Sequence, residues 1–354
     1  MPIQRTVWRL PRAGSLSRLQ RCDETLPELG PGEARVRVDA VGLNFADLFA
    51  AQGLYSATPR GSFIPGLECA GIVEALGPGL SHDAPYAIGD RVIALTRFGA
   101  YATALNVGLP YLRPVPAGWS AAQAAAWPVQ GLTAWYALLP LGNVQPGHVV
   151  LVQSAAGGVG LQALDMLGRL GARAIAVVGQ ESKRQFLIER RGLAPEAVVV
   201  RDARRFGAQL DASLGALGAD GLDCVLDAVL GPTFRPTFAR LRPEGRYVLF
   251  GAADFMTRGA RPNYPRLAFE YLRRPRLDPL AMISANRSFM AFNLIWLWER
   301  ADRLPAAYAE LERLTPAPPH VGAILPFDRA PEAMALLQGG GTIGKVVLKV
   351  GDGK

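Results

Sequence analysis

The pattern of hydrophobic and polar positions changes along the chain. In the N-terminal part, residues 35–41 alternate charged and apolar side chains, and residues 91–95 follow a Gly-Asp turn. Such alternation is typical of antiparallel strands with one face in water. From residue 149 onward, helix-length segments separate short apolar runs at residues 149–153, 174–178, 197–200, 224–228 and 247–250. This pattern predicts a parallel, doubly wound sheet, and the chain then ends with an expected helix and strand at residues 330–338 and 345–350.

Composition and charge narrow the possible classes of protein. Half of the 354 residues are hydrophobic, so the chain can bury a large core, and its length suggests about two domains. The net charge of +8 comes mainly from scattered arginines, which argues against nucleic-acid binding but could attract an anionic substrate. The cysteines are far apart and predict neither a disulfide framework nor a metal site; they are Cys22, Cys69 and Cys224. We therefore expect a protein of a reducing compartment, the cytoplasm.

Two segments imitate targeting signals. The first 21 residues hold five arginines and no acid, as a transit peptide would, but they lack a signal-peptide apolar run and fit a strand at residues 6–10. Residues 114–164 carry no charged side chain, yet every window long enough for a transmembrane helix is interrupted by Pro128, Gly131, Pro140 or Pro146. We expect a buried helical region here and no integral membrane segment.

The stretch VLVQSAAGGVGL, residues 150–161, places a glycine-rich turn directly after an apolar strand. In the dinucleotide fingerprint G-x-G-x-x-G, the glycines permit a tight turn, backbone approach to the pyrophosphate, and packing of helix on strand. The first of these positions is Ala155 instead of glycine, but a helix expected at residues 159–170 and a further strand support the motif. We expect a pyrophosphate at the start of this helix, bound by Ala156, Gly157, Gly158, Val159 and Gly160.

The end of the second strand predicts which dinucleotide binds. NAD-binding units usually place an acid there for the ribose 2′-hydroxyl, whereas basic residues accommodate a 2′-phosphate. Gly179 stands at the expected acidic position, and the following residues Ser182, Lys183 and Arg184 can donate hydrogen bonds and charge. The alternative is a solvated helix start with Glu181 as an ordinary first-turn acid. We favour NADPH as the cofactor.

Further motifs run nearly from end to end: GLNFAD at residues 42–47, QGLY at 52–55, PGLECAG at 65–71, AAGGVG at 155–160, ANR at 285–287 and GKVVL at 344–348. With them the chain resembles the medium-chain dehydrogenases/reductases of the zinc-independent quinone oxidoreductase class. It is most similar to the branch of the vesicle amine transport protein. The resemblance implies an α/β fold, with a GroES-like, mainly antiparallel β catalytic domain at residues 1–123 and 306–354. A Rossmann NADP(H)-binding domain would occupy residues 124–305.

The resemblance also indicates what is missing. Zinc-dependent relatives place a cysteine ligand where Asn44 stands and a His-Glu pair where Leu67 and Glu68 stand. Leu67 cannot bind zinc, so we expect no catalytic metal. The three histidines have no partner spacing and favour surface or structural roles; they are His82, His148 and His320. Without a Lewis acid, alcohol oxidation is disfavoured.

The favoured reaction is reduction of a quinone, enone or enoyl thioester by NADPH. Hydride addition leaves an enolate, which needs a hydrogen-bond donor and a proton. The resemblance places Asn44, Asp47 and Tyr55 beside the nicotinamide, as the candidate catalytic residues. Tyr55 is the preferred proton donor, because a phenol can supply a proton and related enoyl reductases use the tyrosine at this place. The alternative for Tyr55 is a loop aromatic that caps the cleft.

Other segments are expected to complete the cofactor site. Gln130 and Thr133 match the family position beneath the nicotinamide, although helix packing alone would explain Thr133. Gly251 and Ala252 follow the fifth strand, where small residues let the backbone approach a ligand. Lys345 is also assigned to the cofactor. It closes a P-loop-like stretch, GGGTIGK, but a strand is expected after it where a P-loop needs a helix, so we reject nucleotide hydrolysis.

The substrate itself is left open. Residues 254–283 form an insertion that covers the cleft or packs outside it, and its arginines could bind an anionic acyl carrier. A small molecule such as a quinone would not need them. Two alternatives therefore stand beside the first function. One is a carrier-protein-dependent enoyl reductase of a biosynthetic pathway, and the other is a weakly or non-catalytic NADPH-binding protein that acts at a membrane or partner surface.

The apolar segment RSFMAFNLIW begins at Arg287 and is expected to form a sixth strand at the sheet edge. An exposed edge of this hydrophobicity would favour aggregation. The family resemblance implies that two subunits join here, through residues 287–294, in a two-fold homodimer. The competing possibility is that a helix near residues 298–314 covers the edge and leaves a monomer.

Overall fold

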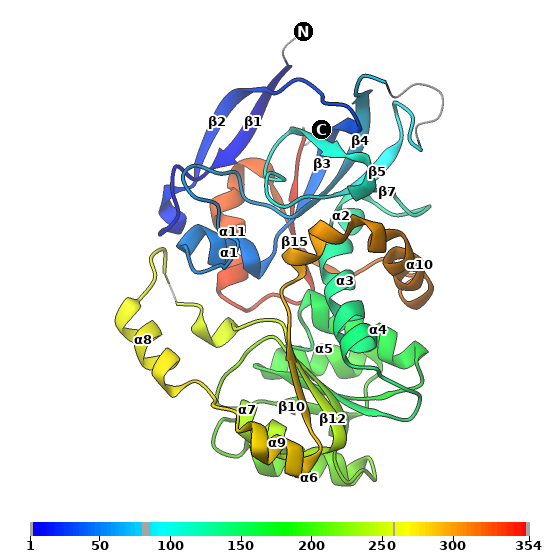
Figure 1. Cartoon of the computed structure of the whole chain (residues 1–354), viewed down its shortest axis with the longest axis vertical. Helices are drawn as coiled ribbons and strands as arrows, with labels where there is room; N and C mark the ends of the chain where they lie inside the picture. The colour runs from blue at the N-terminus through cyan, green and yellow to red at the C-terminus, as the bar shows by residue number, and fades with distance from the viewer. Residues whose placement is uncertain (1–2, 80–84, 258, 352–354) are drawn as a thin grey trace.

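Two larger sheets, one mainly antiparallel and one parallel, organise the chain (Figure 1). The computed structural model describes residues 3–79, 85–257 and 259–351. Strands from both ends of the chain build the antiparallel unit, and the middle of the chain builds the parallel one. The predicted α/β fold with two kinds of sheet is confirmed. The exact domain limits stay a prediction.

The antiparallel unit holds a seven-stranded sheet in which β15 joins β14 to β3. All its neighbouring strands are antiparallel except β14 and β15. The strands expected at residues 35–41 and 91–95 lie in β3 and β5. The strands are β3 (Glu33–Gly42), β4 (Glu68–Leu76), β5 (Arg91–Leu95), β6 (Ala104–Gly108), β7 (Leu112–Pro114), β14 (Val321–Pro326) and β15 (Lys345–Lys349). A separate antiparallel pair consists of β1 (Ile3–Arg9) and β2 (Gln20–Leu26).

The parallel sheet has the order β10-β9-β8-β11-β12-β13. The chain builds outward from β8 in one direction, then returns to β11 and builds in the other, so the β8–β11 boundary is the switch point where such folds bind ligands. The five apolar runs fall on its strands, as predicted. The strands are β8 (Val149–Gln153), β9 (Arg173–Val178), β10 (Val198–Val200), β11 (Leu222–Asp227), β12 (Leu241–Leu249) and β13 (Ser288–Ala291).

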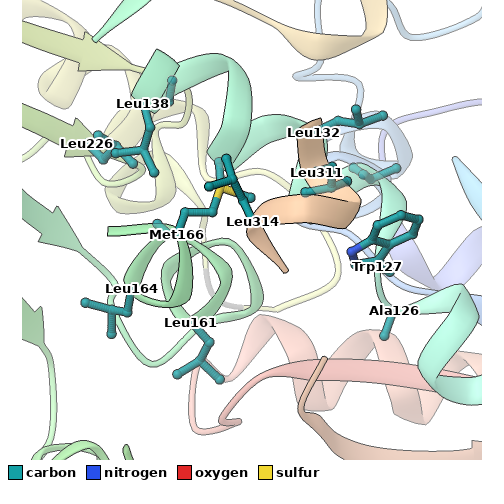
Figure 2. Close-up of a cluster of buried hydrophobic side chains, with 14 of the residues drawn as sticks. Ala126, Trp127, Leu132, Leu138, Leu161, Leu164, Met166, Leu226, Leu311 and Leu314 are labelled. Carbon is teal, nitrogen blue, oxygen red and sulfur yellow. The ribbon is translucent and has the colours of Figure 1, made fainter. Parts of the chain in front are cut away.

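Helices cover the parallel sheet and join the two units. α3 packs against α4 and α10, and Figure 2 shows part of the resulting core, with Leu132 of α3, Met166 of α4 and Leu314 of α10 in one cluster. The helices of this part are α2 (Ala121–Ala125), α3 (Pro128–Tyr136), α4 (Gly158–Arg169), α5 (Glu181–Arg191), α6 (Phe206–Ala216), α7 (Phe234–Ala239) and α10 (Leu304–Leu314). The antiparallel unit carries α1 (Phe45–Gln52) and α11 (Ala330–Gln338).

Short helical turns connect the larger elements. They are η1 (Leu16–Arg18), η2 (Leu109–Tyr111), η3 (Ala137–Leu141), η4 (Pro195–Ala197), η5 (Ala253–Phe255), η6 (Leu294–Arg303) and η7 (Phe327–Arg329). The uncharged region after residue 114 forms α2, α3, η3 and β8, and many of its apolar side chains are buried. Within the described ranges, no helix is both long and apolar enough to cross a bilayer.

The insertion forms two helices, α8 (Tyr264–Arg273) and α9 (Pro279–Ala285), neither of which buries a residue. In Figure 1, α8 projects from the side of the molecule. Just before it, the chain reaches back to the antiparallel unit, where Gln338 Nε2 donates to the carbonyl oxygens of Thr257 and Gly259 over 2.9 Å. The insertion therefore begins with residues that bind to the antiparallel unit through Gln338, and it continues as an exposed pair of helices.

The predicted sixth strand is present at the edge of the sheet but is shorter than expected. β13 ends at Ala291, and the chain turns into η6 because the side chain of Asn293 accepts a hydrogen bond from Ile295 N and caps that turn. The strand prediction for the end of residues 287–294 was therefore wrong. α10 packs on α3 and α4. In the sheet order of the described residues, β13 has β12 on one side and no strand on the other.

Candidate functional site

The glycine-rich turn lies between β8 and α4, at the switch point of the parallel sheet. Ser154 takes the left-handed conformation, with φ +53°, so the turn does not need glycine at Ala155. Ala155 is buried, and its N–H donates to the carbonyl oxygen of Val177 over 3.0 Å. A Cβ at Gly160 would lie 2.6 Å from the backbone of Ala155, which explains the third glycine of the motif. The replacement of the first glycine is thus compatible with the predicted loop.

The first turn of α4 is open to an anion. Its N-cap residue, Gly157, has no side chain to cap the helix, so the N–H groups of the first turn, from Gly158 onward, have no side-chain cap. The N–H of Gly157 itself donates to the carbonyl oxygen of Ser154 over 2.8 Å. Together with the helix dipole, such groups form a ready phosphate site. Gly344, which directly precedes the last strand β15, connects the other unit to this loop, because its N–H donates to the carbonyl oxygen of Ala156 over 2.8 Å. Since β15 follows Gly344, the rejection of a P-loop is confirmed.

Two residues of α3 were predicted at the cofactor. The amide of Gln130 lies over the loop, where a Cβ at Gly158 would overlap it. Gln130 and the glycine-rich turn are therefore brought together. Thr133 is buried, and its hydroxyl donates to the carbonyl oxygen of Val129 over 2.6 Å. Packing within the helix accounts for Thr133, and its contact with a cofactor stays a prediction.

A buried ion pair ties together the strands and helices around the loop. Lys345 and Glu68 are 1% and 0% exposed, and the Lys345 ammonium contacts a carboxylate oxygen of Glu68. Lys345 also donates to Asn44 Oδ1 over 2.8 Å, and Asn44 Nδ2 donates to the same Glu68 oxygen over 2.8 Å. The other Glu68 oxygen accepts the N–H of Val129, at the start of α3. Lys345 is thus occupied inside the protein, and its predicted cofactor contact is untested.

Asp47 and Asn44 support the start of α1. The carboxylate of Asp47 accepts the backbone N–H of Asn44 over 2.8 Å and the hydroxyl of Tyr101 over 3.3 Å. Burial raises the pKa of Asp47 to about 7, against the stabilising effect of these hydrogen bonds. The predicted residues Asn44 and Asp47 therefore meet in one buried cluster at the start of α1, the helix that precedes Tyr55.

Tyr55 lies at the junction of the two large hydrophobic cores and packs against both. Its hydroxyl donates to Asn293 Oδ1 over 2.7 Å, and the same amide donates from Nδ2 to Ser56 Oγ over 3.1 Å. Burial raises the pKa of Tyr55 to about 12, the hydrogen bond to Asn293 opposes this shift, and Asp47 adds to it. Sequence reasoning missed Asn293, because its contact with Tyr55 spans 238 positions.

The residues predicted to select NADPH have different surroundings. Ser182 is exposed at the start of α5. Lys183 Nζ donates to the carbonyl oxygen of Gly340 over 2.7 Å, and burial lowers its pKa. Arg184 instead donates to the carbonyl oxygens of Val198 and Pro195, over 3.2 Å each. Arg184 thus supports the chain around η4, while Lys183 and Ser182 lie at the helix start.

A further basic residue, Arg201, lies beside the end of β9, the second strand of the parallel sheet along the chain. Arg201 follows β10, and its Nη2 is 4.0 Å from the position that a Cβ would take at Gly179. Sequence reasoning considered only the residues directly after β9 and missed Arg201. The available signal was that the end of β10 must lie beside the end of β9 in a parallel sheet.

The last predicted cofactor residues follow β12. A Cβ at Gly251 would lie 2.7 Å from the carbonyl oxygen of Ala228. Glycine is therefore required by the neighbouring backbone, whether or not a ligand binds. Ala252 precedes the short turn η5 and is partly exposed. Contacts of both residues with a cofactor stay predictions.

The residues at the positions where zinc-dependent relatives carry their metal ligands, Asn44, Leu67 and Glu68, do not fit a metal ion. Both ends of the Asn44 amide are used within the cluster described above, and a lysine ammonium stands beside Glu68. His148 Nδ1 accepts the N–H of Gln145, and His320 packs on Phe186, whereas His82 lies outside the described residues. The part of the chain that the structure describes holds no group of three or more His, Cys, Asp or Glu residues arranged for a metal.

Two protein-family profiles match the chain. One is the alcohol dehydrogenase GroES-like domain, at residues 30–155, and the other is the zinc-binding dehydrogenase domain, at residues 196–348. The second name contrasts with the donor set around Asn44, which does not suit zinc.

Individual proteins are similar over almost the whole chain. The synaptic vesicle membrane protein VAT-1 homolog of Homo sapiens is 32% identical over 340 residues, covering 95% of this chain and 84% of that protein. The quinone oxidoreductase of Thermus thermophilus, solved also with NADPH, is 31% identical with a TM-score of 0.74, covering 97% and 99%. The CurK enoyl reductase is 26% identical with a TM-score of 0.76, covering 99% and 100%. From the two domain profiles and these end-to-end similarities, the chain belongs to the medium-chain dehydrogenase/reductase family of oxidoreductases, alongside the VAT-1 homologs and quinone oxidoreductases.

Proposed function

We propose that this oxidoreductase uses NADPH to reduce a conjugated carbonyl acceptor without a metal ion. The observation that carries the proposal is the uncapped N-terminus of α4 beside the amide of Gln130, with a buried phenol, Tyr55, at the junction of the two cores. The complex of the Thermus quinone oxidoreductase with NADPH supports the choice of cofactor.

The chain offers a separate group for each part of the cofactor. The N–H groups at the start of α4, from Gly158 to Gly160, would hold the pyrophosphate together with Ala156, whereas Gly157 N–H donates to the carbonyl oxygen of Ser154 over 2.8 Å and would shape the loop. Ser182, Lys183 and Arg201 would hold the 2′-phosphate. The Lys183 ammonium would exchange its present acceptor, a carbonyl oxygen, for the phosphate, and charge-assisted hydrogen bonds are the stronger kind.

Bound NADPH supplies the hydride, which adds to the β-carbon of a quinone, enone or enoyl thioester. The product of that addition is an enolate of the substrate, and Tyr55 would donate its hydroxyl proton to it. The buried cluster of Asn44, Asp47, Glu68 and Lys345 would hold α1, and hence the loop of Tyr55, in place. None of these groups is in contact with the reacting atoms in our proposal, so their role is positional.

The test is a screen of NADPH oxidation, followed by absorbance at 340 nm, against quinones, enones and enoyl thioesters, with NADH as the control cofactor. Turnover with at least one acceptor class, and a preference for NADPH, is expected. Failure of all three classes, with NADPH bound, would favour the alternative, a weakly or non-catalytic NADPH-binding protein that acts at a membrane or partner surface; the similar VAT-1 homolog carries the name of a synaptic vesicle membrane protein.

A carrier-bound enoyl thioester is the second candidate substrate, because a similar structure is an enoyl reductase and the exposed helix α8 carries arginines.

We further propose a cytoplasmic homodimer that pairs β13 of two subunits, since this strand ends the parallel sheet.

A further inference from the structure

Tyr55 and Asn293 come from different units of the fold, and their side chains meet. Tyr55 follows α1 of the antiparallel unit, and Asn293 follows the edge strand β13 of the parallel unit. The side-chain amide of Asn293 contacts two consecutive residues of the other unit, Tyr55 and Ser56. Its oxygen accepts the Tyr55 hydroxyl over 2.7 Å, and its nitrogen donates to Ser56 Oγ over 3.1 Å.

The backbone around Asn293 is fixed. Phe292 N donates to the carbonyl oxygen of Leu249 over 3.1 Å, which continues the pairing of β12 and β13 up to this point. The Phe292 ring packs edge-on against Tyr136 of α3, with ring centres 4.9 Å apart. On the other side, Ile295 is buried and its N–H donates to Asn293 Oδ1 over 3.4 Å. The amide is therefore presented to Tyr55 by a packed scaffold.

Within its own unit, the loop of Tyr55 makes hydrogen bonds through its backbone. The carbonyl oxygen of Tyr55 closes a turn with Thr58, accepting its N–H and its hydroxyl over 3.0 and 2.7 Å. These bonds shape the turn, but they leave the direction of the phenol to its packing and to Asn293. The hydroxyl and the amide thus form one hydrogen-bonded unit across the boundary.

We propose that Asn293 is a positioning residue for proton transfer from Tyr55, holding the phenol before the transfer and stabilising the tyrosinate after it. This inference rests on the proposed function of Tyr55. An amide suits both states: Oδ1 accepts from the phenol and, after a half-turn about the Cβ–Cγ bond that gives up the 3.4 Å hydrogen bond from Ile295 N, Nδ2 donates to the oxyanion. A carboxylate could serve only the first state.

The proton balance is simple. Hydride addition to the β-carbon moves the C=C electron pair into an enolate. The O–H bond of Tyr55 then breaks, and the proton forms a new C–H bond at the α-carbon of the substrate. A proton taken up from the solvent then restores the phenol, so the reduction consumes one hydride and one proton in all. Asn293 gains and loses no proton in this sequence, so its contribution is the placement and stabilisation of the Tyr55 oxygen.

The test compares wild-type protein with Asn293→Ala, Asn293→Asp, Tyr55→Phe and the double variant Tyr55→Phe/Asn293→Ala in single-turnover NADPH oxidation. Asn293→Ala should slow the rate constant by about ten- to a hundredfold with NADPH affinity unchanged. In the Tyr55→Phe background the same change should have no further effect. Asn293→Asp is nearly isosteric and still accepts from the phenol, but its charge opposes a tyrosinate, so it should not restore the rate.

Two results would overturn the positioning role of Asn293: a wild-type rate for Asn293→Asp, or equal losses from Asn293→Ala with and without Tyr55. Ser120→Ala is the control, because Ser120 is exposed, also caps a helix, α2, and its loss should leave the rate unchanged. A wild-type rate for Tyr55→Phe would instead refute the proposed proton donor, and this inference with it.

A second readout needs neither substrate nor cofactor. If the amide and the phenol form one unit, the losses in unfolding temperature of Tyr55→Phe and Asn293→Ala should be non-additive in the double variant. Additive losses would overturn the contact itself. Non-additive losses combined with no turnover of any acceptor would show that the contact stands while the proposed function, and the catalytic role of Asn293, fail.

Discussion

The side-chain amide of Gln130 lies in the space that a Cβ would need at Gly158. Gly158 begins α4, and Gln130 belongs to α3, so the two helices meet closely at the predicted pyrophosphate site. The backbone conformation of Gly158 is not left-handed, so the effect of a side chain here would come from displacing the Gln130 amide.

Gly158→Ala should therefore displace Gln130 and weaken NADPH binding by about tenfold, or about 1.4 kcal/mol. Fluorescence titration measures the affinity. The control is Gly168→Ala in the same helix, where a Cβ would meet no atom within 4 Å. That change should leave binding intact and raise stability by about 0.5–1 kcal/mol, because alanine is the better helix former. Equal NADPH affinity for Gly158→Ala and wild type would contradict the site.

Cofactor choice should depend on Arg201. Its charge-assisted hydrogen bonds to a 2′-phosphate would be worth about 1.5–3 kcal/mol, so Arg201→Ala should weaken NADPH at least tenfold and leave NADH unchanged. Lys183→Ala should act in the same direction. Arg205, which pairs with Asp202 on the surface, provides the control Arg205→Ala. Equal losses for both cofactors would reject Arg201 as the selective residue.

Asp47 should make stability depend on pH. Its pKa in the folded protein is about 7, above the ordinary value of 3.8, so between these values the folded state binds the proton more tightly than the unfolded state. This contribution is complete below about pH 4 and is lost as the pH rises through about 7. Each unit of such a shift is worth about 1.4 kcal/mol, which urea unfolding can resolve.

Asp47→Asn should flatten that part of the stability profile, whereas Asp328→Asn, at an exposed position, should leave it unchanged. An unchanged slope in Asp47→Asn would mean that the carboxyl does not titrate in this window.

The proposed dimer can be tested at Ala291. Phe292 N–H is used within the subunit, so the alternation of a strand turns the N–H of Ala291 toward the open edge. Ala291→Pro removes that donor and should convert a dimer to a monomer in light scattering, while Ala291→Val should keep the dimer. A wild-type monomer would refute the assembly, and a dimer of Ala291→Pro would place the contact elsewhere.

The parallel sheet and its glycine-rich loop could be predicted because their signals are local. A β-branched run, a turn and a helix follow one another within about 20 residues, and each supports the next. The strand near Arg287 was placed at the edge correctly, but its end was missed. Asn293 ends the strand by capping η6. In the sequence this single capping residue stands inside an apolar run, and the run predicts that the strand continues.

The candidate site was only partly accessible in this way. The motifs located Gln130, Tyr55 and the glycines, but the partners of Tyr55 and Lys345 lie 238 and 277 positions away. No periodicity links such residues. Lys345 shows the difficulty. The motif around it suggests a contact with a phosphate of the cofactor, whereas in the structure its ammonium forms a buried ion pair with Glu68.

The insertion of β15 between β14 and β3 has a consequence for folding. β3 ends at Gly42 and β15 begins at Lys345, so the antiparallel sheet contains a contact between segments about 300 residues apart. Contacts of such separation form slowly because a long loop must close first. During synthesis the strands of the parallel sheet, Val149–Gln153 to Ser288–Ala291, leave the ribosome before β15 does. We expect the parallel unit to acquire protease resistance first, and the cluster of Glu68, Asn44 and Lys345 to form only after β15 has been synthesised.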